Sequence, residues 1–208
     1  MSQIKLLHSG GNGVILSAPD SNPASDRTLK LPGDANSTVD TLSRAGNILQ
    51  VVQTVKTDVF SFAASATGNT SGGVSGDAIT ASLTCSSTSN KVLIRGALSV
   101  STSNNNRIGI LVYAGGTQLT AATGDAAGNR SRVNTGGQLG AGSAQQLTLC
   151  HEFLHSPSST SSITYSYRLV NLDSANSRTL YLNRGQDDSN SSHHFRSASI
   201  LTLEEVAA

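Results

Sequence analysis

The stretch QQLTLCHEFLHSPSST, residues 145–160, decides between two folds and two kinds of function. Its residues His151 to His155 match H-E-x-x-H, the signature of zinc peptidases. In a helix the two histidines would lie about 5–6 Å apart on one face and could bind one zinc ion. In a strand they would also share a face, but a rise of about 3.3 Å per residue would separate them by roughly 13 Å. A zinc site at this motif therefore requires a helix.

The residues around the motif indicate a strand. Apolar and polar residues alternate from Leu147 onward, which is the two-residue period of a half-buried strand. The run ends in a serine-rich turn at Pro157, and no third ligand with helical surroundings follows. We therefore expect a protein that is not an enzyme, with no catalytic residue, metal ligand or cofactor. The competing hypothesis is a metal-dependent hydrolase that uses His151, Glu152 and His155.

The composition favours an ordered β-protein. Of the 208 residues only 13% are charged and 4% are aromatic, and serine, threonine, asparagine and glycine take their place. Ser, Asn and Gly suit polar turns because they bond locally to the backbone or tolerate positive φ. The net charge of +1 gives no overall field that would attract nucleic acid or an anionic membrane, so neither is an expected partner.

Nothing in the sequence predicts export or membrane insertion. No apolar run approaches the roughly 20 residues of a membrane helix, and the start, MSQIKLLHSGG, lacks the features of a signal peptide. The two cysteines, Cys85 and Cys150, lie far apart and belong to no framework of several bridges. We expect two free, buried thiols and not one bridge, as a reducing compartment favours.

Residues 1–56 differ from the rest of the chain. Short extended pieces such as GVILSAP and TLKLP are separated by turns rich in Gly, Pro and Asn. NSTVDTLSRAG, residues 36–46, predicts one short helix, capped at Asn36 or Ser37 and ended by Gly46. A strand then begins in NILQVVQTVK. Because this region has too little apolar content for a core of its own, we expect an arm that packs on another structure.

From residue 57 to residue 208 the sequence predicts a domain of eight or nine antiparallel strands, and both a two-sheet sandwich and a barrel fit the pattern. The candidate strands are residues 57–62, 78–85, 91–101, 107–116, 117–122, 144–155, 162–171, 178–183 and 197–206. The core candidates, as apolar members of alternating strands, are Leu147, Leu149, Phe153, Tyr165, Leu180 and Leu201.

Two parts of the sequence resemble known families. Residues 14–61 resemble the amino-terminal segments of tail-fibre-like proteins from marine bacteriophages, especially those that infect cyanobacteria. The frame of this likeness is TLKLP at residues 28–32, followed by GNILQV at residues 46–51. Within residues 153–207, the pieces FLHSPSSTSSITYSYRLVN, RTLYLNRGQDD and SASILTLEEVA resemble the last strands of jelly-roll heads shared by phage fibres and complement-type trimeric globular domains.

The resemblance implies a bacteriophage virion surface protein, assembled in the host cytoplasm as a homotrimer with an anchoring arm and a jelly-roll β-sandwich head. The implied role is a short tail fibre or adhesin, with other virion proteins of the tail or capsid and a host surface glycan as candidate partners. Since almost no shaft separates the arm from the head, a capsid decoration protein is the alternative. The arm residues expected to anchor are Leu29, Leu31, Pro32, Ile48, Leu49 and Val51.

Four polar loops are the expected contact regions for a ligand or partner: residues 66–77, 101–107, 123–143 and 184–194. The candidate contact residues are Asn104, Asn105, Arg107, Arg130, Arg132, Asp187, Asp188, His193 and His194. The two arginines of the third loop could contact anions or glycans, and the histidines and aspartates of the fourth could gather a divalent ion. Ordinary solvated loops are the alternative in both cases.

Overall fold

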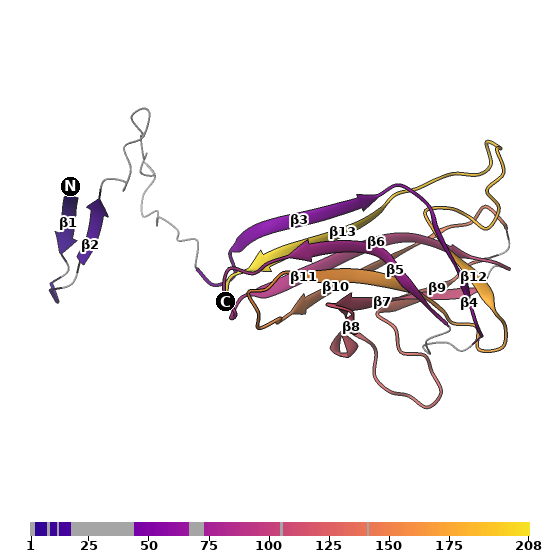
Figure 1. The fold of residues 1–208 in the computed structure, drawn as a ribbon, viewed down its shortest axis with the longest axis horizontal. Helices are drawn as coiled ribbons and strands as arrows, with labels where there is room; N and C mark the ends of the chain where they lie inside the picture. The colour runs from indigo at the N-terminus through magenta and orange to yellow at the C-terminus, as the bar shows by residue number, and fades with distance from the viewer. Residues whose placement is uncertain are drawn as a thin grey trace. The chain divides into compact units, whose positions relative to one another are not determined.

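The period-two patterns of this chain produce strands, and the computed structural model is all-β. It describes residues 3–7, 9–11, 13–17, 44–66, 73–104, 106–140 and 142–208. Contacts divide the chain into two units, Met1–Asp40 and Thr41–Ala208. In the first unit, β1 (Gln3–Leu7) and β2 (Gly13–Ser17) pair antiparallel (Figure 1).

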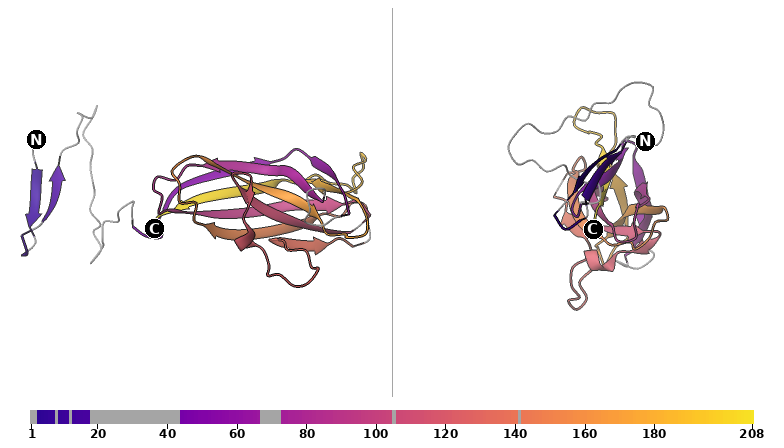
Figure 2. Two further views of the ribbon diagram at one scale, coloured as in Figure 1. Left: turned by 60° about the horizontal axis from the view of Figure 1, so that its bottom comes forward. Right: turned by 90° about the vertical axis from the view of Figure 1, so that its left-hand side faces the viewer.

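The second unit is a sandwich of two antiparallel sheets, which Figure 2 shows from two further sides. The six-stranded sheet contains β3 (Ile48–Lys56), β13 (Ser199–Val206), β6 (Lys91–Thr102), β12 (Arg178–Leu182), β4 (Phe60–Ala64) and β10 (Leu147–His155). The five-stranded sheet contains β5 (Val74–Leu83), β11 (Ile163–Asn171), β7 (Arg107–Ala114), β8 (Thr117–Gln118) and β9 (Thr135–Gln138). The predicted all-β sandwich is confirmed, with eleven strands among the described residues of this unit where eight or nine were expected.

The strand pairs of the sandwich are nested in the sequence. β7 pairs with β9, β6 with β10, β5 with β11, and β3 with β13, all antiparallel. Each of these four pairs encloses the one before it along the chain, and the four lie in alternate sheets. A fifth antiparallel pair, β4 with β12, is also nested and lies in the same sheet as β3 and β13. This is how a long double-stranded ribbon folds over itself, and it is the jelly-roll arrangement.

The expected boundary between the arm and the head needs correction, and the short helix expected near it stays a prediction. Residues 48–56 were expected in the arm, but they form β3 of the six-stranded sheet, and the contacts divide the chain after Asp40. The physical reason is that β3 pairs with β13 along its length and Val52 packs against the core. The helix predicted at residues 36–46 lies almost entirely outside the described residues; Gly46 has φ +89° and lies in the turn from Arg44 to Asn47 that leads into β3.

The core lies between the two sheets and contains the predicted residues. Four of the core candidates are buried: Leu149, Tyr165, Leu180 and Leu201. The other two, Leu147 and Phe153, are partly buried and pack against the core. The short strand β9 was missed. Its sequence, TGGQ, offers two glycines and no apolar alternation, so only its pairing with β7 makes it a strand.

A buried carboxylate closes one end of the sandwich. Glu205 of β13 is 1% exposed and accepts hydrogen bonds from the backbone N–H and hydroxyl of Ser86, at 2.6 and 2.7 Å. Asn90 and Gln50 donate to the same side chain. Burial alone would raise the pKa of Glu205, but these hydrogen bonds lower it to about 2. The carboxylate therefore joins β3, β13 and the turn between β5 and β6.

The chain enters the sandwich at this same end. Gly46 donates to the carbonyl of Ala207, and Ala207 donates to the carbonyl of Asn47, both at 2.8 Å. β13 runs from Ser199 at the opposite end to Val206 here. The segment that precedes Ser199, between β12 and β13, therefore lies about 25 Å away, at the rise of a β-strand. We call the two ends the arm end and the loop end.

Gly96 of β6 is required by a close approach between the sheets. A Cβ at this position would lie 2.4 Å from the ring of Tyr167, which is fully buried on β11. Because that ring is fixed by its neighbours in a close-packed interior, it has no free space to move into. Glycine here allows the large tyrosine to fill the centre of the sandwich.

We predict that Gly96→Ala lowers the free energy of unfolding by about 1–3 kcal/mol, as overpacking of a core does. Gly76→Ala is the matched control, because a Cβ at that glycine of β5 has no atom within 4 Å. Denaturant unfolding of both variants would check this. Equal stabilities for the two variants would contradict the close approach.

Candidate assembly face and ligand loops

The register of four neighbouring strands places three rows of side chains on the outer face of the six-stranded sheet. Residues that are paired across antiparallel strands point to the same face. Across β3, β13, β6 and β10 the rows are Val51, Glu204, Leu93 and Leu154; Gln53, Thr202, Arg95 and Glu152; and Val55, Ile200, Ala97 and Cys150. A polar row thus lies between two mainly apolar rows. We call this surface the banded face.

The banded face carries most of the large apolar side chains that the sandwich leaves in solvent. Among the described residues, six such side chains are exposed: Ile48, Val51, Val55, Leu154, Phe195 and Ile200. All except Phe195 lie on the banded face or beside it, since Ile48 is paired with Val206 at the end of the same face. They are between 36% and 58% exposed. Apolar exposure of this kind, gathered on one face, marks an interaction site more often than a solvated surface.

The polar row is held by an arginine between two glutamates. Arg95 Nε lies 2.9 Å from Glu152 Oε2, and Arg95 Nη1 lies 3.0 Å from Glu204 Oε1. Glu204 is only 6% exposed, and its second oxygen, Oε2, is the one buried side-chain oxygen or nitrogen in the described residues that has no hydrogen-bond partner. A buried acceptor left unpaired costs about 1–3 kcal/mol or more. This acceptor is therefore a source of instability in the single chain.

The H-E-x-x-H motif lies on β10, so the predicted strand is confirmed. His151 and His155 point into the sandwich, where each ring Nδ1 lies 3.0 Å from a tyrosine hydroxyl, that of Tyr167 and of Tyr165 respectively. Both tyrosines belong to β11 in the other sheet, so these hydrogen bonds cross-link the two layers. Glu152 faces the other way, to Arg95. The described residues contain no group of three or more His, Cys, Asp or Glu side chains that could hold a metal ion.

Two of the predicted loops meet at the loop end. The N–H of Asn104 donates to Oε1 of Gln186, which joins the turn between β6 and β7 to the segment after β12. Asn104 has φ +58°, a left-handed conformation that asparagine tolerates better than most residues. Arg107 begins β7 next to this turn. Asn105 lies outside the described residues.

The aspartates and histidines of the last loop are bound mainly to arginines and to each other. Asp188 accepts from Arg196 and is paired with Arg184 at 3.4 Å. Hydrogen bonding from Arg196 lowers the pKa of Asp188. His194 Nε2 lies 3.5 Å from Asp187, and its Nδ1 lies 3.0 Å from Ser189. Neither arginine was predicted as a contact residue, although Arg184 is four residues from Asp188.

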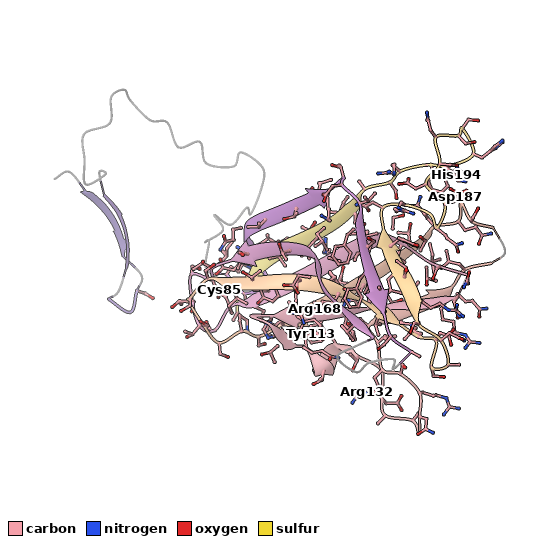
Figure 3. All side chains as sticks on the ribbon, turned by 45° about the vertical axis from the view of Figure 1, so that its right-hand side comes forward. Cys85, Tyr113, Arg132, Arg168, Asp187 and His194 are labelled. Carbon is pink, nitrogen blue, oxygen red and sulfur yellow. The ribbon has the colours of Figure 1, made fainter. Side chains whose placement is uncertain are left out.

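Arg130 and Arg132 belong to a different part of the molecule. They lie in the long connection between β8 and β9, where Arg132 Nε donates to the carbonyl of Gly124 at 2.7 Å and Arg130 donates to that of Ala127. Figure 3 shows Arg132 well apart from Asp187 and His194. These two arginines are therefore separate from the contact residues of the loop end, although the third loop itself reaches that end at Ser143, whose carbonyl accepts from the N–H of Asp187. Most of the first predicted loop, at residues 67–72, lies outside the described residues. His193 is exposed and does not line the cavity that is formed by its neighbours.

Some of the predicted arm residues lie outside the described residues, and the others lie in the sandwich. Leu29, Leu31 and Pro32 lie outside the described residues. Ile48, Leu49 and Val51 are in β3, and two of them belong to the apolar part of the banded face or its border. One signal in the sequence could have revealed this face. β3 has apolar residues in both phases of its alternation, so they cannot all reach the core.

Both cysteines are free, as expected, but only Cys85 is buried. The prediction of a buried thiol is wrong for Cys150, because its phase in β10 places it on the banded face, opposite Ala97. Burial raises the pKa of the Cys85 thiol, and the nearby Glu205 adds to this. Among the residues described, no helix is long and apolar enough to cross a membrane.

The sequence matches no protein-family model and has no significant similarity to a curated protein. Among solved structures, the chain is similar to the structure of infectious bursal disease virus Gt strain, with 17% identity and a TM-score of 0.41 over 95% of this chain and 48% of that one. It is also similar to the VP2 subviral particle of that virus, with 18% identity and a TM-score of 0.40 over 95% and 48% of the two chains. The chain thus spans about half the length of these viral proteins, and such distant likeness carries no conclusion about function.

We predict that the free energy of unfolding falls as the pH drops below about 6.5. Burial lowers the pKa of both His151 and His155, so the folded chain resists protonation that the unfolded chain accepts. The carboxylates affect the free energy of unfolding at lower pH than the histidines do. Glu205 has its pKa lowered to about 2, so it loses its contribution to stability only as the pH falls below the usual pKa range of glutamate. Denaturant unfolding measured between about pH 8 and about pH 5.5 would separate the effect of the histidines on stability from that of the carboxylates.

The double variant His151→Gln, His155→Gln should flatten this profile. His193→Gln, at an exposed ring outside the sandwich, should keep the wild-type slope. A double variant whose stability still depends on pH as the wild type does would show that these two rings are not the cause.

Proposed function

We propose that this chain is a non-enzymatic bacteriophage virion surface protein, a short tail fibre or adhesin that is anchored by its amino-terminal arm and assembles as a homotrimer through the banded face. The observation that carries the proposal is the concentration of exposed large apolar side chains on that face. The phage assignment rests on the resemblance of residues 14–61 to tail-fibre-like proteins.

Further copies of the same chain fit the banded face better than a partner whose charges are all of one sign. Its polar row holds one arginine and two glutamates, so neighbouring copies can present opposite charges to each other. The apolar rows on either side would supply the burial, at about 25 cal/mol for each Å² removed from water. Around a threefold axis, each copy would meet two neighbours through different parts of its surface, as closed rings require.

Glu204 gives this assembly a specific polar contact. Its Oε2 atom is buried without a partner, while the adjacent Arg95 is about half exposed and can reorient. Because the oxygen is buried within the chain itself, an Arg95 side chain that is reoriented by a neighbouring copy would be the group that donates to it. The free energy that the isolated chain loses at this acceptor would then be recovered on association.

The two ends of the sandwich support a directional role. The arm joins at the arm end, and the predicted contact residues Asn104, Asp187 and Asp188 gather at the loop end. The β1–β2 hairpin is a separate unit, and a two-stranded hairpin is at best marginally stable alone in water, which supports docking of the arm on another virion protein. An anchored chain would then present the loop end to a host surface glycan.

A capsid decoration protein is the second candidate, and one observation favours it. Asn47 bonds directly to Ala207, so the described chain runs from Arg44 straight into the sandwich with no shaft between them. A sandwich with no shaft among the described residues before its first strand suits a protein that covers neighbouring capsid subunits.

We predict that Val51→Lys with Val55→Lys converts the trimer to monomers, because two lysines in the apolar rows would have to be desolvated on association. Both positions are more than half exposed, so folding should be unaffected. Light scattering coupled to gel filtration would give the mass. Phe195→Lys, at the exposed apolar residue off this face, is the matched control and should remain trimeric.

Cys150 supplies a second measurement on the same samples. It lies on the banded face, so a maleimide should label it in the monomeric double variant and more slowly in the trimer, while buried Cys85 stays unlabelled in both. A wild-type chain that is monomeric at all concentrations, or a double variant that stays trimeric, would exclude this interface.

We predict that gold-labelled antibodies find the protein at the tail of intact virions, at a low copy number by quantitative mass spectrometry. Label over the head at a high copy number would favour capsid decoration instead. A preparation of infectious virions without the protein would refute the virion role in both forms.

A further inference from the structure

We propose that the cavity formed by residues 188–196, at the loop end, is a subsite for one neutral sugar ring. This inference rests on the proposed function as an adhesin and names the chemistry of its ligand. The cavity has a volume of about 330 Å³, which is at the lower end of the range for small-molecule sites. Its lining residues are Asp188, Ser189, Asn190, Ser191, His194, Phe195 and Arg196.

Phe195 provides an apolar surface where a sugar needs one. It is 55% exposed, whereas the other three phenylalanines are partly buried and pack against the core. Its backbone is fixed, because its carbonyl accepts a hydrogen bond from Gln146 at 2.8 Å. A pyranose has one face made mainly of C–H groups, which are weakly positive, and an aromatic ring presents a negative face to them.

Arg196 and Asp188 provide polar groups beside that ring. The Arg196 side chain is 53% exposed and Asp188 is 24% exposed, so both still have atoms open to solvent. A guanidinium donates hydrogen bonds and a carboxylate accepts them. Adjacent hydroxyls of a sugar can do both, so one hydroxyl can donate to Asp188 while its neighbour accepts from Arg196. Asn190, whose amide can donate and accept, lines the same cavity.

These groups are held in place before any ligand binds. Arg196 contacts Asp188 through two of its nitrogens, and Arg184 Nη1 lies 3.4 Å from Oδ2 of the same carboxylate. Arg184 is itself fixed by hydrogen bonds to the carbonyls of Gly185 and Gln186. Preorganised groups lose little conformational entropy on binding, which favours a weak ligand such as a single sugar.

The charges of the site favour a neutral ligand. Asp188 and Arg196 both line the cavity and contact each other, so their formal charges cancel. A carboxylated or sulfated sugar would have to compete with Asp188 for the guanidinium of Arg196, which contacts both oxygens of that carboxylate. The ligand class is therefore a neutral hexose or N-acetylhexosamine at the end of a glycan.

Saturation-transfer NMR on the full chain would test the site with methyl glycosides of glucose, galactose, mannose and N-acetylglucosamine, and with the methyl glycoside of N-acetylneuraminic acid as the anionic comparison. We expect at least one neutral glycoside to bind, and Phe195→Ala to weaken its affinity about fivefold, since an aromatic contact contributes roughly 1 kcal/mol. Asn190→Ala should also weaken it. His193→Ala, next to the cavity but not lining it, should not.

Three outcomes would overturn the inference: no neutral glycoside binds, Phe195→Ala binds as well as the wild type, or the anionic glycoside binds more tightly than all the neutral ones. These results are distinct from a failure of the proposed function. A chain that binds sugar but is absent from virions keeps the subsite and loses the virion role. A trimer present on virions that binds no glycoside keeps the role and loses the subsite.

Discussion

The register that joins β3, β13, β6 and β10 is the constraint on which the rest of the structure depends. It sends Val52, Leu203 and Ile94 into the core and leaves Val51 and Leu93 outside. A slip of one residue would exchange the two sets, because side chains alternate strictly along a strand. The same register pairs His151 with Gly96, so that one row supplies both the cross-sheet hydrogen bond and the space for Tyr167. The strand register thus decides both which side chains form the core and which form the banded face.

The strands could be predicted from the sequence where alternation is strong. β10 and β11 are examples, and the strand at His151 excludes the spacing that a zinc peptidase needs. β9 could not be predicted, because Thr135–Gln138 has no pattern of its own and is a strand only by pairing with β7. β3 was predicted as a strand but assigned to the arm, since its partner β13 lies at the other end of the chain.

The site was less predictable because it depends on contacts between distant residues. The sequence singled out Asp188 and Asn104, but not that Gln186 joins their loops or that Arg196 holds the aspartate. The banded face was missed altogether. In one sequence, the inner and outer phases of a strand such as β3 look alike when both are apolar, and only the position of the second sheet tells them apart.

The antiparallel ladder between β3 and β13 has a mechanical consequence. The chain enters β3 at the arm end, and the loop end lies beyond the far end of both strands. Tension between a held arm and a ligand gripped at the loop end would therefore run along β3, at right angles to its hydrogen bonds. The eight residue pairs of the ladder would bear that load together, in shear, instead of peeling apart one after another. A particle attached through this sandwich would pull on the ladder in the direction in which the ladder resists force best.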